Sequence, residues 1–205
     1  MSEFTNGVLF RNRDIEFVKT LTLHHRIHRL NRQWSAILIP DFANTYEPAV
    51  SALKQLSNEC PLLDFQHAGD HGWAYRIYDS GQIVAWIEVN YELSFNMKVA
   101  LADERYPNEP DMIIFWNQHP EIPEALQKEV EESEEYKQLV HQMVEHKNVE
   151  AFAVFEIDPV VIQQLDELLT AKRYFENMTE PVETFKQLMG FPEMTWISYH
   201  YLENQ

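Results

Sequence analysis

His67, Asp70 and His71 are the residues whose types and spacing best fit a catalytic or metal-binding role in this sequence. They lie in residues 66–72, a segment with two glycines that we interpret as a flexible loop at the mouth of a hairpin. Two imidazoles and a carboxylate are a common ligand set for catalytic zinc. The loop therefore supports one functional hypothesis, a metal-dependent hydrolase or small-ligand binder, although such a histidine pair without a partner motif also arises by chance.

The other histidine pairs predict less chemistry. His24 and His28 are four residues apart and would share one face of a helix, but the run offers only arginines and no third ligand. His141 and His146 are five apart and would lie on different helix faces. The sequence also lacks a Gly-x-Ser-x-Gly motif and a glycine-rich phosphate loop, which disfavours serine hydrolases and the common nucleotide enzymes.

A hairpin over residues 73–91 is the best-defined structural element. Its alternation places apolar residues on one face: Trp73, Tyr75, Ile77, Ile83, Ala85, Ile87, Val89 and Tyr91. A turn made of Asp79, Ser80 and Gly81 preserves this face, whereas a two-residue turn at Ser80 and Gly81 would mix it with polar residues. We therefore predict the three-residue turn.

The opposite face of the hairpin carries the second set of candidate residues, Arg76, Tyr78, Trp86 and Glu88. Aromatic residues beside arginine are enriched in protein interfaces, so this set predicts an interaction patch. The alternative is that a helix covers this face, with Trp86 in the core and Arg76 stacked over its ring.

Periodicity assigns the remaining elements. We expect helices over 14–34, 48–58 and 123–147, a helix beginning at Asp158-Pro159, and a helix over 181–189 that Gly190 ends. The glutamate-rich residues 129–135 indicate a solvated helix face with a break. We expect further strands over 36–39, 62–65, 95–101, 112–116, 151–157 and 195–202.

This order predicts an α+β fold with a mainly antiparallel mixed sheet, covered by helices on one side, and an amphipathic N-terminal helix. The element order resembles a ferredoxin-like split β-α-β arrangement with additions at both ends. We expect a single domain over residues 1–205, with residues 1–35 as a basic helical segment packed on it or extending from it.

The chain has a formal charge of −17, and its charges are unevenly spread. Residues 1–35 hold six Lys and Arg against three acids, while the rest holds ten against thirty. The acidic body argues against nucleic acid and anionic membranes as partners. A single cysteine and the lack of a signal peptide or long apolar span indicate a cytoplasmic protein.

The composition favours a non-enzymatic, acidic interaction domain that binds another protein, with a basic protein as the candidate partner, as inhibitors and immunity-type proteins do. This reading requires no catalytic motif and no cofactor. A variant of it is a homodimer in which the basic N-terminal helix docks on the acidic body of a second copy. The alternative remains the metal-dependent hydrolase or small-ligand binder at His67, Asp70 and His71, with zinc as its cofactor.

Overall fold

The computed structural model describes residues 3–40 and 47–203. Within these ranges, six strands form one antiparallel sheet in the order β2-β3-β1-β4-β5-β6. The strands are β1 (Phe4–Arg11), β2 (Arg26–Arg29), β3 (Trp34–Leu38), β4 (Leu62–Ala68), β5 (Gly72–Asp79) and β6 (Gln82–Asn90). The predicted α+β class with a mainly antiparallel sheet is confirmed, whereas the ferredoxin-like order is not.

The N-terminal region begins with a strand, and the predicted helix over 14–34 is wrong because that segment holds β2 and the start of β3. β1 lies between β3 and β4 in the middle of the sheet, and its Val8, Leu9 and Phe10 are fully buried. A strand that is buried on both faces has no alternating pattern that a sequence reading could detect. The predicted basic helical segment 1–35 is instead β1, β2, the start of β3 and the short helices η1 (Asn12–Asp14) and α1 (Ile15–Val18).

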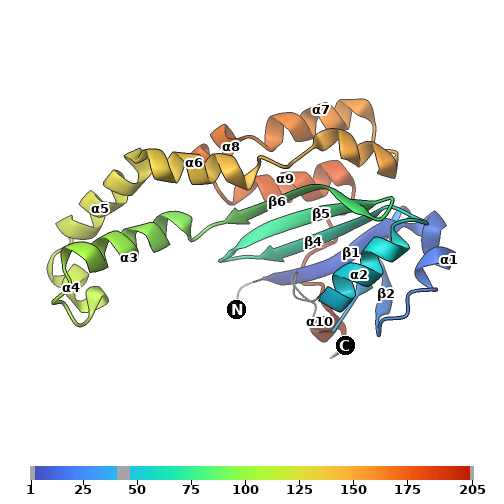
Figure 1. The fold of residues 1–205 in the computed structure, drawn as a ribbon, viewed down its shortest axis with the longest axis horizontal. Coiled ribbons are helices and arrows are strands. Elements are labelled where there is room, and N and C mark those ends of the chain that lie inside the picture. Colours follow the sequence, from blue (N-terminus) through green and yellow to red (C-terminus); the bar gives the residue numbers. More distant parts are fainter. Residues whose placement is uncertain (1–2, 41–46, 204–205) are drawn as a thin grey trace.

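Helices cover both faces of the sheet, not one (Figure 1). One face packs against α1 and α2 (Glu47–Leu56), and its core includes Val8, Phe10, Ile37, Leu53 and Tyr78. The other face packs against η2 (Val149–Phe155), α7 (Pro159–Leu168), α8 (Ala171–Glu176) and α9 (Glu180–Met189). Because each face buries its own apolar residues, the sheet is the middle layer of three.

The hairpin is present, but its turn differs from the prediction. Asp79 pairs with Gln82, so the turn has two residues, Ser80 and Gly81, with φ of 50° and 78°. A bulge between Ile77 and Tyr78 then shifts the register, and Tyr75 still faces Ile87 on the buried side. The bulge keeps the apolar face that the three-residue turn was meant to explain, but it leaves Ile83 37% exposed.

Four further predicted strands are helical. Residues 95–101 belong to α3 (Leu93–Arg105), residues 112–116 to α4 (Met112–Gln118), and most of 151–157 to η2. Residues 195–202 form a bend followed by α10 (Tyr199–Glu203). Short apolar runs do not distinguish a strand from a helix by periodicity alone, so the strand assignment of these four segments was wrong.

The break near Ser133, the helix start at Asp158 and the helix end at Gly190 agree with the predicted boundaries. The break in the glutamate-rich segment is Ser133, which separates α5 (Glu121–Glu132) from α6 (Glu134–Met143) and caps α6 by accepting from the Tyr136 amide. Asp158 caps α7 by accepting from the Val160 amide at 2.8 Å. Gly190 ends α9 with φ of 76°, in the left-handed region.

α3, α4 and α5 form an arm (residues 93–132) that projects beyond the end of β6 (Figure 1). The chain then returns through α6 to the helical layer over the sheet. Buried residues in the arm are few among those the structure describes: Ala102, Leu126 and Val130. The arm therefore has only a small core of its own.

Residues 146–148 run along the outer edge of β6. The Trp86 amide donates to the His146 carbonyl at 2.9 Å, and the Asn148 side chain donates to the Val84 carbonyl at 2.8 Å. These bonds satisfy backbone groups of an edge strand that would otherwise be open to another chain. No helix within the described ranges is both long and apolar enough to cross a membrane.

Candidate functional site

The structure separates the two histidines of the predicted metal loop. β4 continues to Ala68, so the loop is shorter than predicted and His67 is a strand residue. His67 is buried, with its Nδ1 atom 3.7 Å from Glu3 Oε1. The side chain of His71 is 68% exposed in the turn beside Asp70, and its Nδ1 atom lies 2.9 Å from Glu92 Oε2. These residues therefore do not form a single ligand set.

His67 belongs instead to a cluster with Glu3, Glu183 and Lys186. One ligand atom each from Glu3, His67 and Glu183 lie within 4.8 Å of one another, which is the spacing that a metal ion requires. The fully buried Lys186 ammonium, however, lies 2.5 Å from Glu183 Oε1 and 3.9 Å from Glu3 Oε1. The lysine supplies the positive charge that a metal would bring, so these residues fit an ion-pair network better than a metal centre.

The pKa values of the two histidines are shifted in opposite directions. Burial lowers the pKa of His67, against the opposing effect of Glu3, and this favours the neutral imidazole at neutral pH. The hydrogen bond to Glu92 raises the pKa of His71, which favours its protonated form. A neutral buried imidazole beside a lysine and an exposed ion pair do not make a shared acid-base site.

The hairpin candidates lie on the sheet face that α2 partly covers, and their exposure varies. Tyr78 is fully buried in the core beneath α2. Trp86 is half-buried, and its ring stacks on His146 with 4.6 Å between centroids. Arg76 pairs in register with both Asp64 and Trp86, and Glu88 is exposed. Among the four, Glu88 therefore offers the most accessible side chain.

One groove brings together a residue from each predicted set. Glu88 and His71 both line a space of about 300 Å³ over the small residues Ala68 and Ala74 at the end of β4, β5 and β6. Its other lining residues are Phe4, Gln66, Gly72, Trp73, Val89, Asn90 and Glu92. The described residues of the lining include no serine, cysteine or threonine, and its titratable side chains are His71, Glu88 and Glu92.

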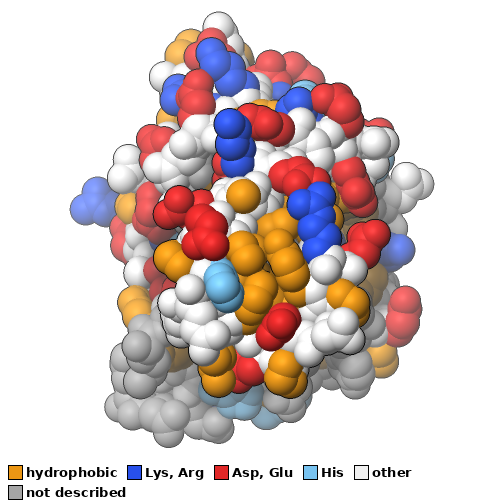
Figure 2. Space-filling view, turned by 90° about the vertical axis from the view of Figure 1, so that its left-hand side faces the viewer, with side chains coloured by type: hydrophobic (Ala, Val, Ile, Leu, Met, Phe, Trp, Pro, Cys, Tyr) orange, Lys and Arg blue, Asp and Glu red, His pale blue; other side chains and the backbone are white. Residues whose placement is uncertain are grey.

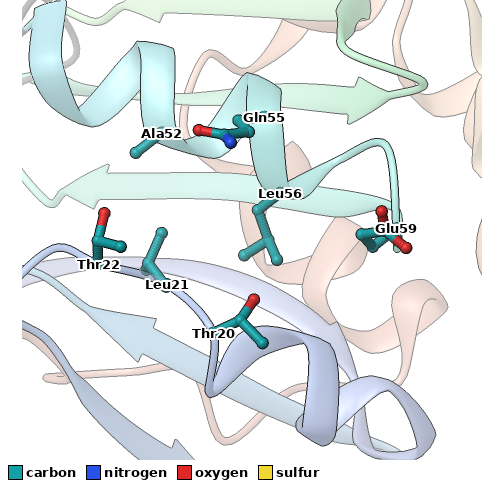
Figure 3. A pocket seen from close by; sticks show the side chains of 7 residues that line it. All are labelled: Thr20, Leu21, Thr22, Ala52, Gln55, Leu56 and Glu59. Atoms are coloured by element: carbon teal, nitrogen blue, oxygen red, sulfur yellow. The ribbon is translucent and has the colours of Figure 1, made fainter.

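A second pocket, of about 210 Å³, lies between α2 and the segment that follows α1 (Figure 3). Leu21 points up toward α2, and Leu56 points down toward residues 20–22. Thr20, Thr22, Gln55 and Glu59 supply its polar atoms. Glu59 is the only titratable side chain among the described residues that line it.

The tip of the arm exposes large apolar side chains that the sequence reading did not single out. Ile113 is 71% exposed and Ile114 is 55% exposed, both in the first turn of α4. Asp111 caps this helix by accepting from the amides of both isoleucines at 3.0 Å. The cap fixes the helix start and so keeps the two isoleucines at the surface.

An aromatic pair joins α3 to α4, and its Trp116 lies one turn after Ile113 on the same helix. Phe95, 49% exposed, makes an edge contact with Trp116, with ring centroids 6.5 Å apart. The ammonium of Lys98 lies 5.1 Å from the Phe95 ring centroid and 5.2 Å from that of Trp116. We call Phe95, Ile113, Ile114 and Trp116 the tip patch.

Acidic residues surround the tip patch. Residues 93–132 contain nine acids and three Lys and Arg, and Arg105 already pairs with Glu129. Figure 2, which looks at this end of the molecule, shows apolar side chains gathered in the middle of the face with charged ones around them. An apolar centre within a charged rim is the usual organisation of a protein-binding surface.

A sequence signal for the tip patch did exist. Pro110-Asp111 before an apolar run resembles the capping signal that located α7 at Asp158, and it would have assigned α4 as a helix. The exposure of Ile113 and Ile114 has no such signal, because it depends on where the arm ends. Comparison with protein-family models, with curated proteins and with solved structures gives no match.

Proposed function

We propose that this chain is a non-enzymatic, acidic protein-binding domain whose contact surface is the tip patch of the arm. The observation that carries the proposal is the pair Ile113 and Ile114, held at the surface by a capped helix at the end of a projecting arm. Burial of large apolar side chains supplies about 25 cal/mol for each Å² removed from water. Two isoleucines with an adjacent aromatic pair are suited to be the central anchors of an interface.

The charge of the arm selects the partner chemistry. Its acids, among them Glu104, Glu109, Asp111 and Glu121, are exposed around the apolar centre. A partner segment with apolar anchors flanked by lysine or arginine would match both parts of this surface. We therefore propose a basic amphipathic segment of another protein as the ligand, which agrees with the partner expected from the composition.

A labelled leucine-lysine amphipathic helix tests this proposal by fluorescence anisotropy. The Ile113→Asp/Ile114→Asp double variant is expected to bind it at least tenfold more weakly, a loss of about 1.4 kcal/mol or more. Aspartate is favourable in the first turn of a helix, so the variant keeps α4 folded. Circular dichroism verifies the fold before binding is measured.

Two controls make the test specific. Val160→Asp removes an apolar side chain that is 64% exposed on α7, away from the arm, and should leave the affinity within about twofold. A leucine-glutamate helix should not bind the wild type, because the rim repels it. Equal binding by the wild type and the double variant, or equal binding of both helices, would remove the tip patch from the proposal.

The two alternatives receive less support. The homodimer variant required a basic N-terminal helix, but residues 4–11 are a central strand of the sheet. The metal-dependent hydrolase required His67 and His71 in one site, and they lie apart. A cytoplasmic location is part of the proposal, because a chain with a single cysteine has no internal disulfide. Cys60 is buried, and burial raises the pKa of its thiol to about 12, which suits a packing residue rather than a reactive one.

A further inference from the structure

Three arginines from separate segments meet at one pocket, which is unexpected in a chain with a formal charge of −17. Arg11 ends β1, Arg13 lies in η1, and Arg32 lies in the turn between β2 and β3. Together with Asn12, Gln33 and Glu156 they line a space of about 260 Å³. Pockets for drug-sized ligands begin at about 300 Å³, so this one suits a small group.

Arg11 is held rigidly in the pocket wall. Its guanidinium lies 4.3 Å from the Trp34 ring centroid, its Nε atom donates to the Phe155 carbonyl at 2.8 Å, and its Nη1 atom donates to Gln33 Oε1 at 3.2 Å. A guanidinium has five N–H donors, and these two bonds leave others directed elsewhere. Because the side chain is already ordered, binding a ligand costs little additional conformational entropy.

Arg13 and Arg32 add positive charge beside it. Arg13 pairs with Glu156 at 2.5 Å and lies 3.6 Å from Asp14, while Arg32 is exposed and forms no recorded ion pair with any described residue. Burial and the charge of Arg13 both lower the pKa of Arg11 from its ordinary value. The charge of Arg13 contributes to this lowering after burial, and an anion beside the two guanidinium groups would offset it.

Glu156 occupies the position of such an anion at present. Its side chain is 71% exposed, so the pair with Arg13 is open to exchange. A planar guanidinium offers paired N–H donors that match the oxygens of a phosphoryl group. A phosphoryl dianion balances the charge of three guanidinium groups better than a single carboxylate does. We propose that Arg11, Arg13 and Arg32 bind a phosphoryl group, which displaces Glu156 from Arg13.

Titration of the full chain with inorganic phosphate, followed by NMR at constant ionic strength set with sodium chloride, tests the site. The salt screens the acidic body, because the Debye length is about 8 Å at physiological ionic strength. Arg32→Gln is expected to weaken phosphate binding at least tenfold, because it removes a positive charge and its hydrogen-bond donors from the pocket. Arg29→Gln removes the same charge three residues away, outside the pocket, and should change the affinity less than twofold.

Glu156→Gln gives the opposite result if the proposal is right, because it frees Arg13 and should tighten phosphate binding severalfold. An unchanged or weaker affinity in that variant would contradict the role of Arg13. Absence of saturable phosphate binding, or equal losses in Arg32→Gln and Arg29→Gln, would overturn the site as a whole.

The phosphoryl group could come from free phosphate or from a phosphorylated side chain, and O-phosphoserine with a serine control distinguishes these sources. Tighter binding of O-phosphoserine than of inorganic phosphate would assign the pocket to a phosphorylated protein segment. Equal or weaker binding would assign it to free phosphate. Binding of serine itself at the same strength would contradict phosphoryl recognition altogether.

Discussion

Replacing Asp64 with asparagine is expected to remove most of a steep loss of stability between pH 4 and pH 8. Asp64 lies in β4 with 2% of its surface exposed, and burial raises the pKa of its carboxyl to about 7, against the opposing charge of Arg76. The same carboxyl in the unfolded chain titrates near pH 4. The folded protein therefore keeps a proton that the unfolded chain releases, and stability falls as the pH rises through this window.

The size of this effect follows from the difference between the two pKa values. A pKa of about 7 in the folded protein against about 3.9 in the unfolded chain corresponds to roughly 4 kcal/mol lost between pH 4 and pH 8. Asparagine has nearly the same shape and does not titrate. The free energy of unfolding of Asp64→Asn, relative to that of the wild type, should therefore rise by about 4 kcal/mol between pH 4 and pH 8.

Urea unfolding at pH 4, 6 and 8 measures this difference for Asp64→Asn and for Asp103→Asn. Asp103 is exposed on α3, so its replacement should leave the pH dependence within about 0.5 kcal/mol of the wild type. The comparison uses the change in the free energy of unfolding between pH 4 and pH 8 for each protein. This change reports the titration alone, because the cost of placing an amide in the sheet is the same at every pH. Parallel stability curves for the wild type and Asp64→Asn would show that the carboxyl does not titrate as described.

The second large effect is expected from Phe185→Ala, which should destabilise the protein by about 3–5 kcal/mol. Phe185 of α9 is fully buried and lies parallel to the Tyr75 ring, with centroids 5.3 Å apart. Its ring centroid also lies 5.0 Å from that of Trp73 and 5.8 Å from that of Phe152. Its removal would leave a cavity between the sheet and the helices above it.

Phe17→Ala is the matched control, because Phe17 is 43% exposed on α1 and its loss should cost less than about 1 kcal/mol. Urea unfolding monitored by tryptophan fluorescence compares both variants with the wild type. If Phe185→Ala proves too unstable to study, Phe185→Leu should still lose a smaller but measurable amount. A loss below about 1 kcal/mol for Phe185→Ala would mean that the helical layer can repack over the sheet.

The sequence predicted the hairpin well because side-chain alternation is strong when one face is buried. The predicted turn was wrong because a bulge and a two-residue turn together give the same parity as a three-residue turn. The register distinguishes the two, because the structure pairs Tyr75 with Ile87 and Ile77 with Ala85, each two residues further along β6 than a three-residue turn would give. Alternation determines which face a residue occupies but not how the strands are aligned.

The N-terminal helix was mispredicted for a related reason. Apolar residues between 14 and 34 recur at three- and four-residue steps, yet the segment makes a hairpin whose turn begins at Asn31. The Asn31 side chain accepts from the amides of Gln33 and Trp34, and such a turn competes with a helix. Pairing with β1, which the sequence did not reveal, stabilises the hairpin.

α3 is the opposite case, a helix whose sequence was predicted to be a strand. Phe95, Met97, Val99 and Leu101 alternate as in a strand, but Met97 and Leu101 are also four residues apart, as on one helix face. In the structure, both of these residues pack against the core. Leu93, one turn earlier, continues the helical spacing, and including it would have favoured the helix.

The candidate sites could be predicted only in part. Local patterns identified Glu88 and His71 but gave no means of placing them in one groove. The pocket of Arg11, Arg13 and Arg32 depends on contacts between β1 and the turn after β2, which are distant in the chain. The order of strands in the sheet brings these three arginines together. The periodicity of apolar residues in the sequence does not predict that order.

The arm has a consequence for the dynamics of the protein. Its helices bury only Ala102, Leu126 and Val130 among the described residues, so the arm should open locally at lower free energy than the sheet unfolds. Its amides should therefore exchange with solvent faster than those of β1. If only the closed arm binds a partner, the observed affinity is lowered in proportion to the fraction of molecules in which the arm is closed. Substitutions that rigidify α3 and α5 would therefore tighten binding without changing the contact surface.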